Sequence, residues 1–350
     1  MHHSTHRRFS CIPTRRLRRD ALLLSLAASI AISACGSSAT PRISAPRAVK
    51  LAHWIAFAHV RRPLDLARTH AHGSLVLAAA GHLSLLTRTG RAEPFALRPG
   101  GYRSPGGEEP YIAFSPGGCF GSGTVYALRL ASGRGVVEIS ARGAVRPFAA
   151  LSVPGLIDGI AFDQMGGFAH RLLVTSNAGA KTTVEAISCR RVVTTITRSA
   201  PRVEGGIVVA PATFGRFAGD LIAPGETSGQ IFAITPKGKS LLVADSGLPH
   251  GNDIGVESEA FVPRGLRQDA FVADRLTPGN RHPGDDVVLW IRASALGAAG
   301  VRPGDLLVTT EGGALTDAIR CSGVSCRVRF VADGPAIAHV EGHIAFAPFG

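Results

Sequence analysis

Acidic side chains recur at equivalent places in this 350-residue sequence, each shortly before a short apolar segment. Two examples are Asp158 in Asp-Gly-Ile-Ala-Phe and Glu341 in Glu-Gly-His-Ile-Ala-Phe. The full set comprises Glu109, Asp158, Glu204, Glu257 with Glu259, and Glu341. If the apolar segments assemble side by side, the carboxylates converge, and clustered like charges require a cation, a basic partner or protonation.

A cation bound by such carboxylates is expected to be Ca²⁺, because hard oxygen ligands in a loose ring suit this ion better than a transition metal. Polar residues of a later loop and around Glu341 can complete or replace the ligand shell: His250, Asn252, Asp253, His339 and His343. We predict metal ligands at Glu109, Asp158, Glu204, Asn252, Asp253, Glu257 and Glu341. The alternative is that each acid accepts hydrogen bonds from backbone amides of its own glycine-rich loop.

A repeat of about 48 residues explains why the acidic positions are equivalent. An apolar run, a turn and a second apolar run recur at 83–96, 136–149, 183–197 and 230–244. The turns open with a hydroxyl side chain, at Thr87, Ser140, Ser188 and Thr235. Three of these turns place Gly at the fourth position, where a hairpin needs a positive φ. Hairpins repeated at this spacing predict an all-β fold, a six-bladed β-propeller closed by the C-terminal strand.

The second strands of six blades are predicted at 74–79, 124–128, 171–175, 220–223, 270–273 and 305–309. Each is short, rich in β-forming residues and bounded by turn residues. Inner strands are predicted just before second strands, at 111–114, 159–162, 207–209 and 259–262. The first blade lacks a convincing inner strand, so we expect 342–348 to close the ring by pairing with that blade. The segment 293–301 is either a short helix or an irregular inner strand.

The N-terminus has the features of an export signal. Basic residues from Arg15 to Arg19 precede an apolar stretch at 21–32, and Ile32-Ser33-Ala34-Cys35 resembles a bacterial lipobox. The apolar stretch is shorter than the roughly 20 residues that a membrane-spanning helix needs. We therefore predict a lipoprotein signal peptide at 1–34, lipidation of Cys35, a flexible tether at 35–52 and the propeller at 53–350. The expected location is extracytoplasmic, on a bacterial cell membrane, with the lipid as the membrane contact.

Four cysteines follow Cys35, an even number suited to an oxidising compartment. Cys321 and Cys326 bracket a tight turn and are expected to form a disulfide. Cys119 and Cys189 fall in turns on the same face of neighbouring predicted blades, so they form either a second disulfide or two separate buried thiols.

Charge argues against a nucleic-acid partner. The net charge of +13 falls to about +8 without residues 1–34. The arginines are scattered through turns, aromatic residues are few, and no basic run occurs outside the N-terminal segment. We therefore expect solvated surface arginines and no nucleic-acid binding.

The organisation over roughly 54–349 resembles six-bladed propellers of the NHL and gluconolactonase (regucalcin-like) kind. The resemblance depends on repeat length, on inner strands of the Gly-x-Ala-Phe type, and on second strands that end like Val272-Ala273-Asp274. In that family a Glu-Gly-Pro motif supplies a metal-ligating Glu. Glu204-Gly205-Gly206 and Glu341-Gly342-His343 are similar but lack the Pro, and Asn177 and Asn252 match the family's Asn ligands only by loop position.

Two functional hypotheses follow. The first is a lipid-anchored binding protein that uses the channel face of the propeller for a small molecule, a glycan or a protein partner. The alternative, implied by the resemblance, is a metal-dependent hydrolase of a lactone or related ester. In the hydrolase, a bound Ca²⁺ polarises the carbonyl and Glu204, Asp253 or Glu341 acts as the base. The sequence contains neither a Gly-x-Ser-x-Gly nor a His-Glu-x-x-His motif.

Overall fold

The computed structural model describes residues 50–69, 74–95, 109–130 and 133–349. The predicted signal peptide, Cys35 and most of the predicted tether lie outside these residues, so those assignments stay predictions. Within the described part of the chain, no helix is long and apolar enough to cross a membrane. The described residues all belong to one compact unit, Ala48–Gly350.

Four blades of this unit are built from consecutive antiparallel strands, ordered from the inner strand outward. Blade 1 comprises β3 (Pro63–Arg68), β4 (Leu75–Ala79), β5 (His82–Leu86) and β6 (Ala92–Pro94). Blade 2 comprises β7 (Ile112–Phe114), β8 (Val125–Arg129), β9 (Gly135–Ile139) and β10 (Val145–Ala150). Blade 3 comprises β11 (Leu156–Phe162), β12 (Leu172–Ala178), β13 (Lys181–Ile187) and β14 (Val193–Pro201). Blade 4 comprises β15 (Val208–Val209), β16 (Leu221–Gly225), β17 (Gln230–Ile234) and β18 (Ser240–Asp245).

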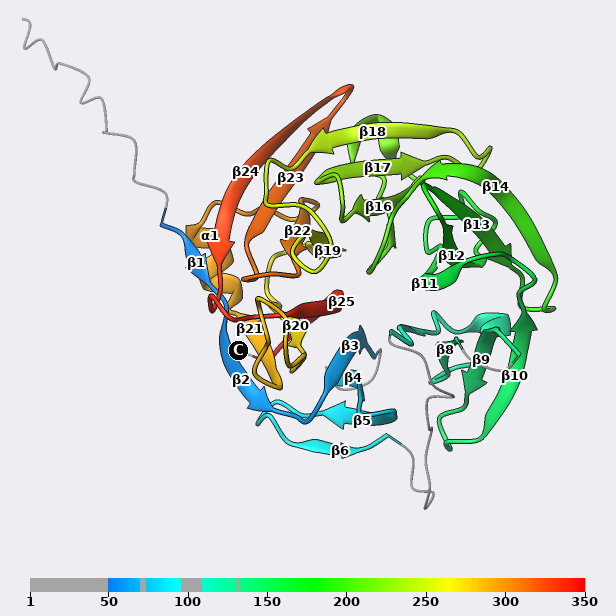
Figure 1. The fold of residues 1–350 in the computed structure, drawn as a ribbon, viewed down its shortest axis with the longest axis horizontal. Coiled ribbons are helices and arrows are strands. Elements are labelled where there is room, and N and C mark those ends of the chain that lie inside the picture. The colour runs from blue at the N-terminus through cyan, green and yellow to red at the C-terminus, as the bar shows by residue number, and fades with distance from the viewer. Residues whose placement is uncertain (1–49, 70–73, 96–108, 131–132, 350) are drawn as a thin grey trace, which may run out of the picture. The chain divides into compact units, whose positions relative to one another are not determined.

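Two further blades contain strands that are distant in sequence (Figure 1). Blade 5 comprises β19 (Val256–Phe261), β22 (Leu306–Thr310), β23 (Thr316–Ser322) and β24 (Ser325–Asp333), with β1 (Ala52–His53) added in parallel to β24. Blade 6 comprises β25 (Val340–Ala347), β20 (Asp269–Asp274), β21 (Val287–Ile291) and β2 (Ile55–His59). The predicted six-bladed propeller is therefore confirmed.

Ring closure differs in detail from the prediction. The C-terminal strand β25 closes the ring, but it pairs with β20 and not with the first blade. Blade 1 has its own inner strand, β3, which pairs with β4. The predicted inner strand at 259–262 corresponds to β19, which pairs with β22 and not with the strand that follows it in sequence. The segment between β21 and β22 contains the short helix α1 (Ala293–Ala298), which settles the helix-or-strand alternative.

Blade 6 contains both β2, which pairs with β21, and the C-terminal strand β25, which pairs with β20, so segments from the beginning and the end of the propeller belong to one sheet. Its side chains pack against blade 1 through a buried cluster that includes Leu66, Leu77, Phe271 and Ala345. Burial of such aliphatic and aromatic surface on both faces of each blade is the main stabilising contribution in this fold.

The repeated turns have the predicted geometry. At the fourth turn position φ is 77° at Gly90, 77° at Gly143 and 80° at Gly238, and Arg191 adopts 66° in the turn without Gly. Each hydroxyl opener accepts a hydrogen bond from the backbone N–H four residues later, at 3.1–3.2 Å. The hydroxyl therefore fixes the turn by bonding its backbone, which explains its recurrence.

Two disulfides join the four cysteines, Cys119–Cys189 and Cys321–Cys326. The first links the η1 segment (Gly118–Phe120) of blade 2 to the β13–β14 turn of blade 3, across 70 residues of sequence. The second closes the β23–β24 hairpin of blade 5. Of the alternatives for Cys119 and Cys189, the structure contains the bridge.

Candidate cation and ligand site

The inner strands begin at one mouth of the central channel, and an acidic side chain accompanies the start of each of them. Blade 1, for which no acid was predicted, contributes Asp65 in β3. The predicted acids come from blades 2 to 6: Glu109, Asp158, Glu204, Glu257 and Glu341. Ring symmetry of the repeats therefore groups the carboxylates around one axis, as the equivalent sequence positions indicate.

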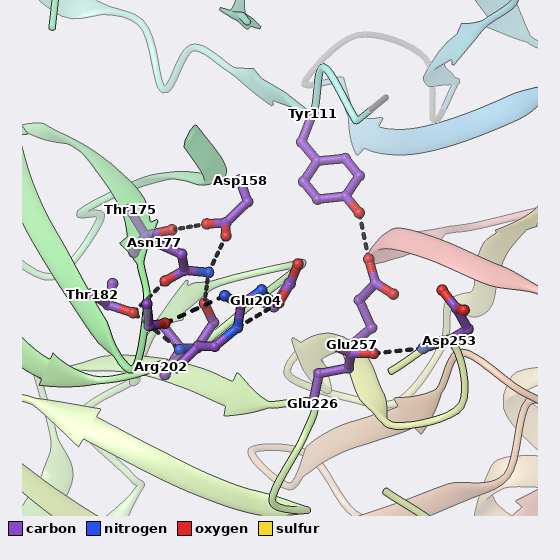
Figure 2. Close-up of polar contacts among 12 residues, drawn as sticks. Tyr111, Asp158, Thr175, Asn177, Thr182, Arg202, Glu204, Glu226, Asp253 and Glu257 are labelled. Carbon is purple, nitrogen blue, oxygen red and sulfur yellow. Dashed lines mark hydrogen bonds and ion pairs between the residues drawn. The ribbon is translucent and has the colours of Figure 1, made fainter. Parts of the chain in front are cut away.

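Glu341 is the centre of the most buried group. Its carboxylate is fully buried, and its Oε2 accepts a hydrogen bond of 2.9 Å from the Tyr111 hydroxyl. The same hydroxyl contacts Glu257 Oε1, and Figure 2 shows the two side chains pointing toward each other. The Arg275 guanidinium forms an ion pair with Glu341 Oε1 and lies 3.7 Å from Glu109 Oε1. Tyr111 and Arg275 thus join three of the predicted carboxylates.

His339 extends this group on the other side. Its Nε2 lies 2.9 Å from Glu311 Oε1 and 3.3 Å from Glu341 Oε1. Two sets of three side chains therefore share Glu341, and within each set one potential ligand atom per residue lies within 4.8 Å of the others. The sets are Glu311, His339 and Glu341, and Glu109, Glu257 and Glu341. Each set has the compactness that a single bound ion requires.

Burial dominates the electrostatics of the site. It raises the pKa of Glu109 and of Glu257 well above the usual value, and the nearby Glu341 carboxylate adds to both shifts. Burial, with Glu204 and Glu311 nearby, raises the pKa of Glu226 to about 8. Burial opposes the charged form of His339, but hydrogen bonds to Glu311 and Glu341 outweigh it and raise the pKa to about 10. The two acidic neighbours thus favour the protonated form of His339, and burial favours the protonated forms of Glu109 and Glu257.

A second polar group lies around Asp158. This fully buried carboxylate accepts a hydrogen bond of 2.9 Å from the Thr175 hydroxyl and a bond from the Asn177 amide (Figure 2). Burial, with a contribution from Glu204, raises the pKa of Asp158 well above the usual value. Glu204 itself is bound by Arg202, with Nη2 at 2.6 Å from Oε2. Asp158 and Glu204 thus have protein partners of their own.

The loop before β19 holds the two remaining predicted ligands. Asn252 and Asp253 are exposed, and the backbone N–H of Asp253 donates to Glu226 Oε1 at 2.8 Å. Figure 2 shows this backbone contact beside Glu257. The seven predicted ligands therefore fall into three groups: Glu109 with Glu257 and Glu341, Asp158 with Glu204, and the exposed pair Asn252 and Asp253.

A residue that was not predicted, Asp65, also bonds backbone amides, but most of these amides belong to other blades and not to its own loop. Asp65 is fully buried and accepts bonds from the N–H groups of Leu66, Ile112 and His343 at 2.7–2.8 Å. Its carboxylate also lies 3.0 Å from Nδ1 of His343. Asp65 therefore ties the inner strands of blades 1, 2 and 6 together, which is a structural role.

Besides Asp65, sequence reasoning missed five residues of the site: Tyr111, Arg202, Glu226, Arg275 and Glu311. A signal existed for three of them, because Glu226, Arg275 and Glu311 each directly follow a second strand. Loops after second strands share a face with the starts of inner strands, so charged side chains at both places converge. Tyr111 and Arg202 carried no such positional signal.

Glycine allows the inner segments to approach closely. A Cβ on Gly205, where φ is +80°, would lie 2.2 Å from Cγ of Glu257. A Cβ on Gly342, where φ is +69°, would lie 2.5 Å from Oδ1 of Asp65. The Glu-Gly pattern thus has a packing reason: each glycine makes room for an acidic side chain of the adjacent blade.

Comparison with known proteins finds similar solved structures but no family. No protein-family model and no curated protein matches the chain. A streptogramin B lyase matches with 12% identity and a TM-score of 0.44, over 79% of this chain and 72% of that one. A catalytically inactive virginiamycin B lyase from Staphylococcus aureus with quinupristin matches with 13% identity and a TM-score of 0.41, over 82% and 96%. A gluconolactonase from Xanthomonas campestris matches with 12% identity and a TM-score of 0.40, over 67% and 87%. The fold assignment depends on the strand pairing, and these matches carry no inference about activity.

Proposed function

We propose that this propeller is a lipid-anchored extracytoplasmic binding protein that holds its ligand at the acidic channel mouth through a divalent cation. The observation that carries the proposal is an imbalance of charge among the described residues of the mouth. Besides Asp65, which His343 pairs, seven carboxyl groups gather there: Glu109, Asp158, Glu204, Glu226, Glu257, Glu311 and Glu341. Three basic groups oppose them: Arg202, Arg275 and His339. A bound cation relieves this imbalance without retaining protons on the carboxyls.

The set of Glu109, Glu257 and Glu341 suits Ca²⁺ best because its ligand atoms are all carboxylate oxygens. The set that contains His339 is less suited to Ca²⁺, since an imidazole nitrogen is a ligand that transition metals prefer. Arg275 binds Glu341 in the metal-free state, so a cation at the oxygen set competes with its guanidinium. A cation with open positions then accepts hydroxyl or carboxylate oxygens of a small molecule, a glycan or a protein ligand.

Binding is favoured over hydrolysis by the state of the three proposed bases. Arg202 holds Glu204, and Arg275 with Tyr111 holds Glu341. Asp253 is exposed in its loop. The geometry thus supports a charged, oxygen-rich binding site more directly than an activated water.

Calorimetric titration of chelator-treated protein with CaCl₂ at pH 8 tests the cation site. Wild type is expected to bind one ion, and Glu257→Gln is expected to lose at least about tenfold in affinity because an anionic ligand is removed. Glu204→Gln is the matched control, since Glu204 has Arg202 as a partner, and it is expected to stay within about twofold of wild type. At a Ca²⁺ concentration of 100 Kd, binding stabilises the fold by about 2.7 kcal/mol. Absence of binding heat and of stabilisation at millimolar Ca²⁺ would contradict the site.

The lipid anchor is tested separately in bacterial cells. Wild type is expected to incorporate a clickable palmitate analogue and to sediment with membranes, because acyl chains partition into the bilayer. The variant Cys35→Ala is expected to lose the label and to leave the membrane fraction. Cys11→Ala, which changes a cysteine inside the predicted signal peptide, is the control that keeps the label. Equal labelling of wild type and Cys35→Ala would refute the anchor.

A further inference from the structure

The other half of the central channel is an apolar cavity. It has a volume of about 490 Å³ and is lined by residues of the inner strand of every blade. Aromatic rings from four blades contribute to its wall: Phe114, Phe162, Phe261 and Phe346. Isoleucine, valine and alanine residues of the same strands make up most of the remaining wall. Its volume falls in the range of pockets that take one small molecule.

His343 forms the inner end of this cavity. It lines the cavity, and its ring packs edge-on against Tyr111 at a centroid distance of 6.3 Å. Tyr111 in turn belongs to the acidic group, through its contacts with Glu257 and Glu341. His343 therefore lies between the acidic mouth and the apolar cavity, and Asp65 neutralises it at 3.0 Å. The cavity is thus a compartment with a chemistry distinct from that of the mouth.

The charges that face the cavity are basic. Among the described lining residues there is no Asp or Glu, and the two with a basic side chain are His343 and Arg68. Because Asp65 already compensates His343, Arg68 is the group that remains to bind a ligand charge. Arg68 ends β3 and is exposed at the rim, opposite the buried end of the cavity.

We propose that this cavity binds a small carboxylic acid with an apolar body. The apolar body lies against the phenylalanine rings, where burial is favourable and edge-to-face contacts with an aromatic ring add specificity. The carboxylate stays at the rim, where the Arg68 guanidinium provides paired N–H donors in the geometry that a carboxylate accepts. The site is independent of the cation at the opposite mouth.

Naphthalene-2-carboxylate is a suitable probe because it is fluorescent, flat and anionic, and 2-naphthylmethanol is its neutral counterpart. Wild type is expected to bind one naphthalene-2-carboxylate, at least about fivefold more tightly than the alcohol. Arg68→Gln is expected to remove that preference. It should lower the affinity for the acid and leave the affinity for the alcohol within about twofold of wild type. Arg264→Gln changes an exposed arginine outside the lining and is expected to leave both affinities unchanged.

A second variant places a larger side chain in the cavity. Ala260 lines the cavity and is partly exposed, so Ala260→Phe is expected to lower the affinity for both probes at least about tenfold. Circular dichroism is the test of whether Ala260→Phe is folded. The comparison of Arg68→Gln with wild type does not depend on this second variant. Failure of the acid to bind at millimolar concentration would overturn the proposal. It would also fail if Arg68→Gln and Arg264→Gln lowered acid binding equally, or if Glu257→Gln abolished it.

Discussion

Replacing Arg275 with Met is expected to lower the free energy of unfolding of the metal-free protein by about 3–5 kcal/mol at pH 8. The Arg275 side chain is 17% exposed and pairs with Glu341, which is fully buried. Methionine keeps much of the volume but removes the charge, so the Glu341 carboxylate is left buried without its strongest partner. Urea denaturation in the presence of a chelator measures the effect.

The pH dependence of this loss has a definite sign. Burial raises the pKa of Glu109 and the nearby Arg275 opposes that rise, so removal of Arg275 raises this pKa further. A carboxyl whose pKa is raised in the folded state stabilises the fold at low pH and loses that contribution as pH rises. The deficit of Arg275→Met is therefore expected to be smaller at pH 5 than at pH 8.

Arg202→Met is the matched control. Arg202 pairs with Glu204 in the same way, but these side chains are 36% and 15% exposed, so solvent screens the pair. We expect a cost of about 1 kcal/mol or less for this change. Equal costs for the two variants, or a cost below about 1 kcal/mol for Arg275→Met at pH 8, would show that burial does not control this cluster.

The blades were predictable because each repeat contains local sequence features that determine its turns and strands. A hydroxyl side chain and a residue of positive φ determine each repeated turn, and both are visible in single residues such as Thr87 and Gly90. The second strands were equally clear, since a short run of β-forming residues between turn residues is typical of a strand. Local chemistry of this kind needs no knowledge of distant partners.

Ring closure was harder to predict because it depends on distant pairing. β19 directly precedes β20 along the chain, so the two would be expected to share a sheet, yet β20 joins β25 and β2. The inner strand of blade 1, Pro63–Arg68, starts with Pro and alternates only weakly, which hid it from strand patterns. The error in blades 5 and 6 arises because strands that pair there are distant in sequence, which no local pattern reports. The error in blade 1 is local, because β3 pairs with the next strand, β4.

The site was predicted only in part for a similar reason. Repeat symmetry placed Glu109, Glu257 and Glu341 together, which the structure shows. Repeat symmetry cannot reveal which residue neutralises the ring of carboxylates, because Arg275 is present in one blade and is not repeated in the others. Basic partners such as Arg275 are determined by packing between blades. The position of its guanidinium favours the charged form of the carboxylates beside it.

A second large effect is expected in blade 5, away from the channel mouth. Asp317 lies in β23 opposite Val308 and Phe330 and is 2% exposed. Burial raises its pKa from 3.8 to about 7. Well below pH 3.8 the carboxyl is protonated in both folded and unfolded chains, whereas above pH 7 the folded chain must bury its charge. This residue is therefore expected to cost the wild type about 4 kcal/mol of stability between pH 4 and pH 8.

Asp317→Asn keeps the shape of the side chain and removes its titration. The variant is expected to be more stable than wild type by about 2–4 kcal/mol at pH 8 and no more stable at pH 4. Urea denaturation at both pH values checks this, with Asp245→Asn on the exposed end of β18 as a control that leaves the pH profile unchanged. Because a buried charge is the only difference that depends on pH between Asp and Asn, parallel pH profiles for wild type and Asp317→Asn would mean that water reaches this carboxylate.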